Sequence, residues 1–355
     1  MPRVLVVATG RKTRGGITSV IKAHETGEQW KKYHCVWIQT HRDGAAWRKI
    51  LYYLSAWIEF LCLLPFCDIV HFHCAGKTSA KRKIAFAKLA RECRKLVICH
   101  FHPPGPDDIE DEQSHDIVKT LFDQAHKVIV LSPYWERLIN EAYPDRNYPM
   151  EVLWNPCPEA KRDLSTRKKQ ILFAGTLCKR KGYDVLLKAF GKIATKYPEW
   201  KVAFAGNPYL LEGINELEDG KHIAAELGIA NQVEWLGWVT GDMKERTFQE
   251  SAVYCLASEG EGFPMGVLDA WAYGIPCVMT PVGGIPDIVK DAVNGLIFTV
   301  GDIDVLAQKL DQMLSDATLR ENIVKESDKW VYGDFCVKSV TEHLGNIYKN
   351  LLSNH

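Results

Sequence analysis

The 355-residue sequence predicts two doubly wound α/β domains, each built around a parallel β-sheet. Twelve short runs of apolar, often β-branched residues recur along the chain, and helical patterns separate them. The runs are continuously apolar and do not alternate with polar residues, as is typical of parallel strands covered by helices on both faces. The expected strands are residues 4–9, 35–39, 68–73, 95–101, 127–132, 151–154, 171–175, 201–206, 232–237, 252–257, 276–280 and 295–299.

A segment rich in proline and charge, 155–169, separates the first six expected strands from the last six. We therefore expect an N-terminal Rossmann-like domain at 1–160 and a second Rossmann-like domain at 161–330. One more helix is expected at 334–352. Two domains of this kind would place a ligand cleft between the carboxyl ends of both sets of strands.

The composition is that of a soluble globular protein, with 46% hydrophobic and 25% charged residues and a net charge of zero. The charge is unevenly distributed, because residues 1–95 hold eighteen Lys or Arg and six Asp or Glu, a net charge of +12. This region predicts an anionic partner: nucleic acid, an anionic membrane or a phosphorylated acceptor. The eleven cysteines form no CxxC pair and the N-terminus has no signal-peptide pattern, so we expect reduced thiols in the cytoplasm.

Two segments of the basic region bear on membrane association. Residues 50–66 are apolar with one charge, Glu59, and are shorter than the about 20 residues of a membrane span. A buried helix packed on a sheet is the favoured interpretation, and an interfacial helix is the alternative. Residues 77–95 hold eight basic residues, one acid and a single aromatic, Phe86, which disfavours nucleic acid because stacking aromatics are scarce. The stretch 47–95 therefore favours an anionic membrane surface as a partner.

The stretch 258–274, SEGEGFPMGVLDAWAYG, follows an expected strand at the edge of the sheet where ligands bind. Pro264 suits the first turn of a helix, whose N-terminus favours an anion by about 0.3–1 kcal/mol. Gly266 allows a ligand to approach the backbone closely. Glu261 and Asp269 flank this position, and two carboxylates would repel a free phosphate but can bind hydroxyl groups. The pattern therefore fits a nucleotide sugar.

The same stretch resembles the acid-x7-acid motif of retaining glycosyltransferases with the GT-B fold, of the bacterial family 4 type, which has the form EGFP…LEAMA-G-P. Here it reads EGFPMGVLDAWAYGIP. The resemblance continues through AGTLCKRKGYDVLLKAF (174–190), PVGGIPDIV (281–289) and NGLIFTVGD (294–302). It is looser in the first half, through GGITSV (15–20), DIVHFH (68–73) and VICHFH (97–102). It implies that the second domain binds the donor, that the first binds the acceptor, and that the C-terminal helix, within 331–355, packs back on the first domain.

The resemblance implies donor-binding roles for residues at matching positions. Glu261 would contact hydroxyls of the donor sugar, Asp269 would bind ribose where the family usually has a glutamate, and Lys181 would bind the diphosphate. Thr176 stands where the family has an arginine, and Arg180 is the candidate to compensate for it. The implied donor-binding residues are Gly15, Gly16, Gly175, Thr176, Arg180, Lys181, Glu261, Gly262, Phe263, Pro264, Met265, Gly266 and Asp269.

The resemblance also implies how the reaction proceeds. His102 matches the family's histidine near the reacting sugar, so the implied catalytic residues are His102, Glu261 and Lys181. The sugar would keep its anomeric configuration, with the leaving diphosphate taking the acceptor's proton on the same face. Catalysis would come from placed positive charge and from orientation, with no metal and no cofactor.

Two further patterns suggest a metal, and a simpler explanation is favoured for each. HFH occurs at 71–73 and at 100–102, and strand alternation places both histidines of a pair on one face. This spacing is not a recognised zinc signature, and strands that end in a cleft often carry histidine. Residues 302–304, DID, have the DxD form of metal-dependent sugar transferases, but Asp302 is expected to cap the following helix.

The resemblance therefore implies a retaining hexosyltransferase that moves a sugar from a nucleotide-diphosphate donor, UDP-sugar favoured over GDP-sugar, to a glycan or lipid-linked acceptor. Bacterial surface-polysaccharide synthesis is the expected setting, in the cytoplasm or peripherally on the inner face of the plasma membrane. Two alternatives stay open: a nucleotide-sugar epimerase of the same fold, and a non-catalytic nucleotide-sugar-binding subunit, which the departures at Thr176 and Asp269 leave open. A plain NAD-binding protein is disfavoured because no GxGxxG follows an expected strand.

Overall fold

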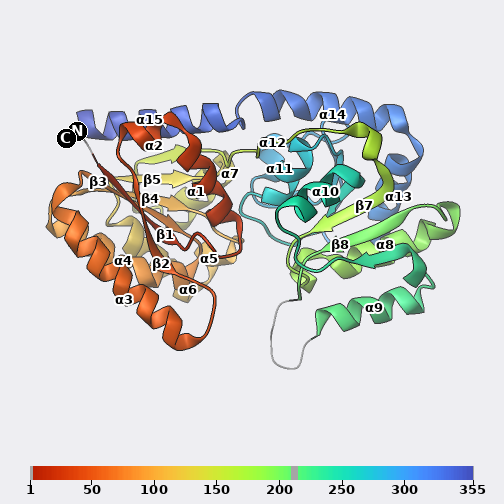
Figure 1. Cartoon of the computed structure of the whole chain (residues 1–355), viewed down its shortest axis with the longest axis horizontal. Coiled ribbons are helices and arrows are strands. Elements are labelled where there is room, and N and C mark those ends of the chain that lie inside the picture. The colour runs from red at the N-terminus through yellow and green to blue at the C-terminus, as the bar shows by residue number, and fades with distance from the viewer. Residues whose placement is uncertain (1–2, 209–214, 355) are drawn as a thin grey trace. The chain divides into compact units, whose positions relative to one another are not determined.

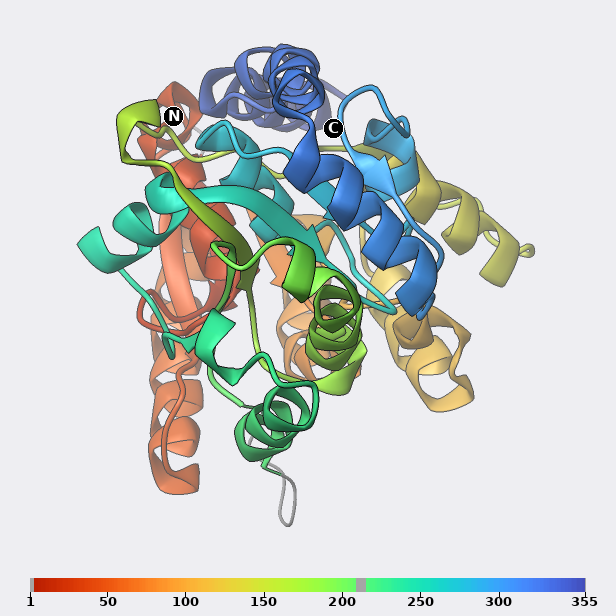
Figure 2. The same cartoon turned by 90° about the vertical axis from the view of Figure 1, so that its right-hand side faces the viewer.

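The computed structural model describes residues 3–208 and 215–354, and the chain divides into two compact units. The first unit comprises Met1–Pro156 and Asp334–His355, and the second comprises Cys157–Gly333. Each unit contains one parallel six-stranded sheet covered by helices (Figures 1 and 2). The predicted α/β class is confirmed, and each of the twelve expected strands is present.

The sheet of the first unit has the strand order β2-β1-β3-β4-β5-β6, with every neighbouring pair parallel. Because β3 lies beside β1 on the side opposite to β2, the strand order reverses between β1 and β3. Open α/β sheets bind ligands at this point of reversal. The strands are β1 (Val4–Thr9), β2 (Val36–His41), β3 (Ile69–Cys74), β4 (Leu96–Phe101), β5 (Lys127–Val130) and β6 (Met150–Val152).

The C-terminal helix α15 belongs to the first unit and covers part of its sheet. Inward residues of β1, β3, β4 and β5 form one core with α1 and α15, in which Leu344, Ile347 and Leu351 contribute from α15. The hydroxyl of Tyr33 donates to the carbonyl of Gly345 across 3.1 Å. The helices of this unit are α1 (Gly16–Thr26), α2 (Glu28–Lys32), α3 (Ala46–Leu63), η1 (Leu64–Phe66), α4 (Lys77–Glu92), α5 (Asp107–Glu110), α6 (Glu112–Phe122), α7 (Pro133–Ala142) and α15 (Val337–Ser353).

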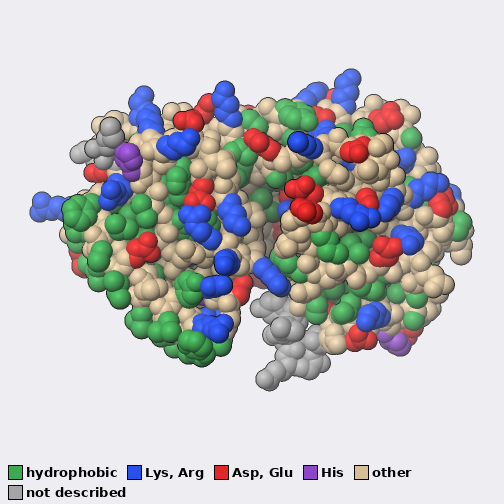
Figure 3. Space-filling model, viewed as in Figure 1, with side chains coloured by type: hydrophobic (Ala, Val, Ile, Leu, Met, Phe, Trp, Pro, Cys, Tyr) green, Lys and Arg blue, Asp and Glu red, His purple; other side chains and the backbone are tan. Residues whose placement is uncertain are grey.

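The helix α3 corrects the expectation that residues 50–66 are buried. Only Ala56 and Phe60 of this helix are buried, and Trp57 stacks on Phe86 of α4 with ring centroids 3.9 Å apart. The opposite face is apolar and exposed. Its residues recur every three or four positions, the spacing that places side chains on one face of a helix. Hydrophobic side chains gather over this helix in Figure 3. The exposed residues of this face, called the α3 face below, are Trp47, Ile50, Leu51, Leu54, Ile58 and Leu61.

The sheet of the second unit has the order β12-β11-β10-β7-β8-β9, so its point of reversal lies between β7 and β10. Helices α8 and α13 pack on one face with a core that includes Phe173, Phe204 and Leu310. The strands are β7 (Lys168–Ala174), β8 (Lys201–Ala205), β9 (Val233–Trp235), β10 (Ser251–Leu256), β11 (Cys277–Met279) and β12 (Leu296–Ile297).

Asp302 is the N-cap residue of the helix that begins at Ile303 in the second unit. The carboxylate of Asp302 accepts from the Val305 N–H across 2.9 Å, so the prediction that Asp302 caps a helix is confirmed. The helices are η2 (Leu164–Thr166), η3 (Lys179–Lys181), α8 (Tyr183–Ile193), η4 (Ala194–Lys196), α9 (Glu216–Glu226), η5 (Ala230–Gln232), α10 (Asp242–Glu250), α11 (Met265–Ala272), α12 (Ile285–Ile288), α13 (Ile303–Ser315) and α14 (Ala317–Tyr332).

Candidate active site

The loops after β7 and β10 meet at the carboxyl edge of the second sheet, where its strand order reverses. The backbone N–H of Glu259 donates to the carbonyl of Arg180 across 2.8 Å, and the Arg180 guanidinium donates to the carbonyl of Gly260. Gly182 follows with a left-handed φ of 72°, and a Cβ there would lie 2.1 Å from the carbonyl oxygen of Ala257. Only glycine at 182 therefore allows the two loops to approach so closely.

This approach places Lys181 against Glu261. Lys181 Nζ lies 2.5 Å from Glu261 Oε1, and Ser258 Oγ donates to the same oxygen across 2.7 Å. The side chain of Glu261 is 8% exposed and that of Lys181 is 20% exposed. A carboxylate and an ammonium group are thus held side by side at the edge where such sheets bind ligands.

The loop after β11 supports the backbone on either side of Glu261. Gly284 N donates to the carbonyl of Gly262 across 3.1 Å. A Cβ at Gly283, which has a φ of 56°, would lie 1.9 Å from the carbonyl oxygen of Glu261. Phe263 is buried. The position of Glu261 therefore depends on three loops, which follow the neighbouring strands β7, β10 and β11.

The start of α11 lies directly after this loop. Pro264 is the N-cap residue and Met265 is the first helical residue. A Cβ at Gly266 would lie 2.1 Å from the hydroxyl of Tyr254, which donates to the carbonyl of Ala174 across 3.3 Å. Close packing against Tyr254 thus accounts for the glycine at 266 without a ligand.

The second acid of the motif, Asp269, pairs with a lysine that the sequence did not suggest. Lys244 Nζ of α10 lies 2.8 Å from Asp269 Oδ2. Burial raises the pKa of Asp269, and the nearby Lys244 ammonium opposes that rise. Asp269 therefore lies against α10 and its lysine, whereas Glu261 lies against Lys181.

Gly175 and Thr176, which follow β7 directly, are half-buried.

The remaining predicted residues lie in the first unit. Gly15 and Gly16 lie at the start of α1, and Gly15 has a φ of 133°, a backbone conformation that favours glycine. His102 follows β4, is 8% exposed, and its Nε2 lies 3.0 Å from Nδ1 of His73 on β3. Burial lowers the pKa of His102 to about 3, so this imidazole is neutral at neutral pH.

Sequence reasoning missed several residues that shape the site. Ser258 and Gly283 lie within the motifs at 258–274 and 281–289, but the sequence did not indicate that both contact Glu261. Lys244 lies in an ordinary polar helix and had no signal in the sequence. His73 belongs to an HFH pair, but its hydrogen bond to His102 joins two strands that the sequence alone could not register.

The fold is similar to that of solved glycosyltransferases, among them one from Rickettsia africae with a TM-score of 0.71 at 16% identity, over 100% of both chains. The structure of HepE from Anabaena in complex with UDP and glucose matches this fold with a TM-score of 0.77 at 15% identity, over 98% of this chain and 100% of that chain. Residues 159–330 match the family described as Glycosyl transferases group 1. The matched residues lie within the second unit.

Several relatives with similar sequences are glycosyltransferases. An uncharacterized glycosyltransferase of Methanocaldococcus jannaschii is 29% identical over 308 residues, which cover 84% of this chain and 72% of that protein. The lipopolysaccharide core biosynthesis glycosyltransferase LpsE of Rhizobium meliloti is 26% identical over 185 residues, which cover 52% of this chain and 50% of that protein.

Proposed function

We propose that this protein transfers a hexose-type sugar from a nucleotide-diphosphate sugar to a glycan or lipid-linked acceptor. The observation that carries the proposal is the Lys181–Glu261 pair at the point of reversal of the second sheet. The ammonium group would bind the donor diphosphate as a point charge, and the carboxylate would accept hydrogen bonds from sugar hydroxyls. The UDP and glucose bound to HepE favour a UDP-sugar over a GDP-sugar.

Donor binding would rearrange the pair. A diphosphate competes with Glu261 for the Lys181 ammonium, and the carboxylate that it releases becomes free to accept from hydroxyl groups. Arg180 adds positive charge to the same loop, and Asp269 would bind the ribose. Positive charge on the leaving diphosphate would supply most of the transition-state stabilisation without a metal. The transfer would retain the anomeric configuration, and the neutral His102 would orient the sugar.

The α3 face supports a lipid-linked acceptor. By length and composition, Ala46–Phe66 is the one helical stretch of the described residues that could cross a membrane, and 17% of its most apolar window is buried. Because Trp57 and Phe60 pack on Phe86 of α4, we propose that α3 lies on the membrane surface with its exposed face toward the lipid. The exposed Arg48 and Lys49 would contact anionic headgroups on the inner face of the plasma membrane.

Thermal unfolding of the purified protein with UDP, GDP, ADP or NAD tests the donor site. A ligand that binds only the folded protein stabilises it by about 2.7 kcal/mol at a hundredfold excess over its Kd. We expect a shift with UDP and none with NAD. The absence of a shift with every nucleotide would contradict the proposal.

Activity with a UDP-sugar and a membrane extract separates transfer from the two alternatives. A transferase releases UDP only when an acceptor is present, and NMR of the product reports the anomeric configuration. An epimerase would convert the donor without an acceptor. A binding subunit would show the thermal shift and no turnover.

A further inference from the structure

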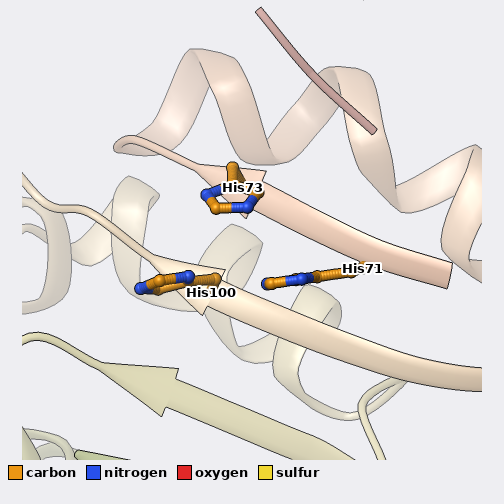
Figure 4. Close-up of side chains that lie close together, drawn as sticks. All are labelled: His71, His73 and His100. Carbon is orange, nitrogen blue, oxygen red and sulfur yellow. The ribbon is translucent and has the colours of Figure 1, made fainter. Parts of the chain in front are cut away.

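The strands β3 and β4 bring three buried histidines together on one face of the first sheet. The parallel register pairs His73 with His100, and strand alternation places His71 on the same face as His73. One ring nitrogen from each of the three lies within 4.8 Å of the others (Figure 4). All three side chains are at most 1% exposed.

The hydrogen bonds of these rings leave at least one nitrogen of each ring unpaired. His71 Nδ1 lies 2.7 Å from the Tyr348 hydroxyl, and His73 Nδ1 lies 3.0 Å from His102 Nε2. Within residues 3–208 and 215–354, His71 Nε2, His73 Nε2 and both nitrogens of His100 have no hydrogen-bond partner. Buried polar atoms are nearly always paired, so a cluster of orphaned nitrogens at one place needs a ligand to explain it.

We propose that His71, His73 and His100 bind one divalent transition-metal ion, for which Zn²⁺ is the best match. Imidazole nitrogen is a preferred ligand of Zn²⁺, and a set of three histidines leaves one further coordination position. Metal-binding histidines usually bond through their second nitrogen to an orienting group. Tyr348 and His102 already occupy that place for His71 and His73.

A further histidine lies beside the cluster. The ring of His24 of α1 is stacked on His100 at a centroid distance of 6.2 Å and tilted against His73 at 5.9 Å, and it lies outside the set of three ligand atoms.

The metal would act on structure and would not enter the sugar transfer. A metal on Nε2 of His73 keeps the proton of that ring on Nδ1, from which it is donated to His102 Nε2. His102 then carries its own proton on Nδ1, so the metal sets the tautomer of the residue that we place near the sugar. It would also join β3 and β4 and, through Tyr348, the C-terminal helix α15.

Metal content of the full chain tests the proposal. The protein is stripped with EDTA, dialysed, and titrated with Zn²⁺ and separately with Co²⁺, whose visible absorption reports nitrogen ligands and coordination number. We expect one equivalent of Zn²⁺ to bind, a four-coordinate Co²⁺ spectrum, and a higher Tm with Zn²⁺. His100→Gln and His73→Gln should each bind Zn²⁺ at least tenfold more weakly. His222→Gln, an exposed histidine of α9, should match the wild type and serves as the control.

Three results would overturn the proposal. The first is a stripped wild type that takes up no Zn²⁺ and shows no Co²⁺ absorption. The second is Zn²⁺ binding that His222→Gln removes and the cluster variants retain, which is the behaviour of surface binding. The third is a spectrum of octahedral Co²⁺. The wild-type titration and spectrum decide the matter even where a cluster variant does not fold.

Discussion

Lys181 and Glu261 lie 80 positions apart in the chain, yet Lys181 Nζ and Glu261 Oε1 are 2.5 Å apart at the edge of the second sheet. Two loops from neighbouring strands meet there because Gly182, which has no Cβ, packs directly against the carbonyl group of Ala257. The pair is therefore a product of the strand order, and it holds the two charges that we assign to donor binding.

Removal of either charge should abolish transfer and weaken the fold. Lys181→Met removes the ammonium group from the buried Glu261 carboxylate, which keeps its hydrogen bond from Ser258. The loss of a hydrogen bond to a charged group lowers the free energy of unfolding by about 1.5–3 kcal/mol. Activity should fall about 100-fold or more, as when one group that stabilises a transition state is removed. Urea unfolding and initial transfer rates measure the two effects.

A double variant separates these effects. Lys181→Met with Glu261→Gln removes both charges, so the free energy of unfolding should recover while transfer stays absent. The exposed pair Lys201–Glu234 is the control, and Lys201→Met should change the free energy of unfolding by less than about 0.5 kcal/mol. Normal transfer by the double variant would remove Lys181 and Glu261 from the site.

Loss of Lys244 should destabilise the protein more at higher pH. Without its ammonium group, the pKa of Asp269 rises further above the unfolded value, and charging the buried carboxyl opposes folding as pH increases. The difference in unfolding free energy between wild type and Lys244→Ala should therefore be larger at pH 7.5 than at pH 5. In an Asp269→Asn background the same substitution should show no such dependence on pH.

Acid should destabilise the metal-free protein below pH 6.5. Burial lowers the pKa of His24 to about 4 and that of His102 to about 3, so the unfolded state binds protons that the folded state does not. Their contribution is present above pH 6.5 and is lost as pH falls, by up to about 1.4 kcal/mol per pH unit for each histidine. Urea unfolding in EDTA from pH 7 to 4.5 measures the slope, which His102→Gln should reduce. An equal slope in that variant would contradict the assignment.

Glycine at 182 should be required for steric reasons and not only for its backbone angle. Gly182 and Gly228 have φ values of 72° and 69°, but a Cβ at 182 would lie 2.1 Å from the Ala257 carbonyl oxygen and a Cβ at 228 meets nothing within 4 Å. Gly228→Ala should therefore cost about 1–2 kcal/mol. Gly182→Ala should cost more and should abolish UDP binding. Equal losses of stability in thermal unfolding would refute the steric argument.

The α3 face should determine membrane binding without contributing to stability. Leu51→Ser with Ile58→Ser should leave the unfolding free energy within about 1 kcal/mol, because both side chains are exposed. Co-sedimentation with vesicles that contain an anionic lipid should fall at least tenfold. Leu164→Ser, an equally exposed leucine of the second unit, is the control and should bind as the wild type does. Unchanged binding by the double variant would place the membrane contact elsewhere.

The two parallel sheets and the stretch from Glu261 to Asp269 could be predicted from the sequence. Continuous apolar runs and helix caps such as Asp302 are local properties, so they are legible without the fold. The sequence left open whether α3 is buried or exposed, because a run that is apolar on every side resembles a buried helix until its packing partner, here Phe86, is known.

The contacts between distant residues could not be predicted from the sequence. The pairing of Asp269 with Lys244, the support of Glu261 by Gly283, and the gathering of His71, His73 and His100 all depend on strand order, register and helix placement. These contacts join residues from separate elements, and their distances follow from how the elements pack. The order of residues along the chain carries no measure of that packing.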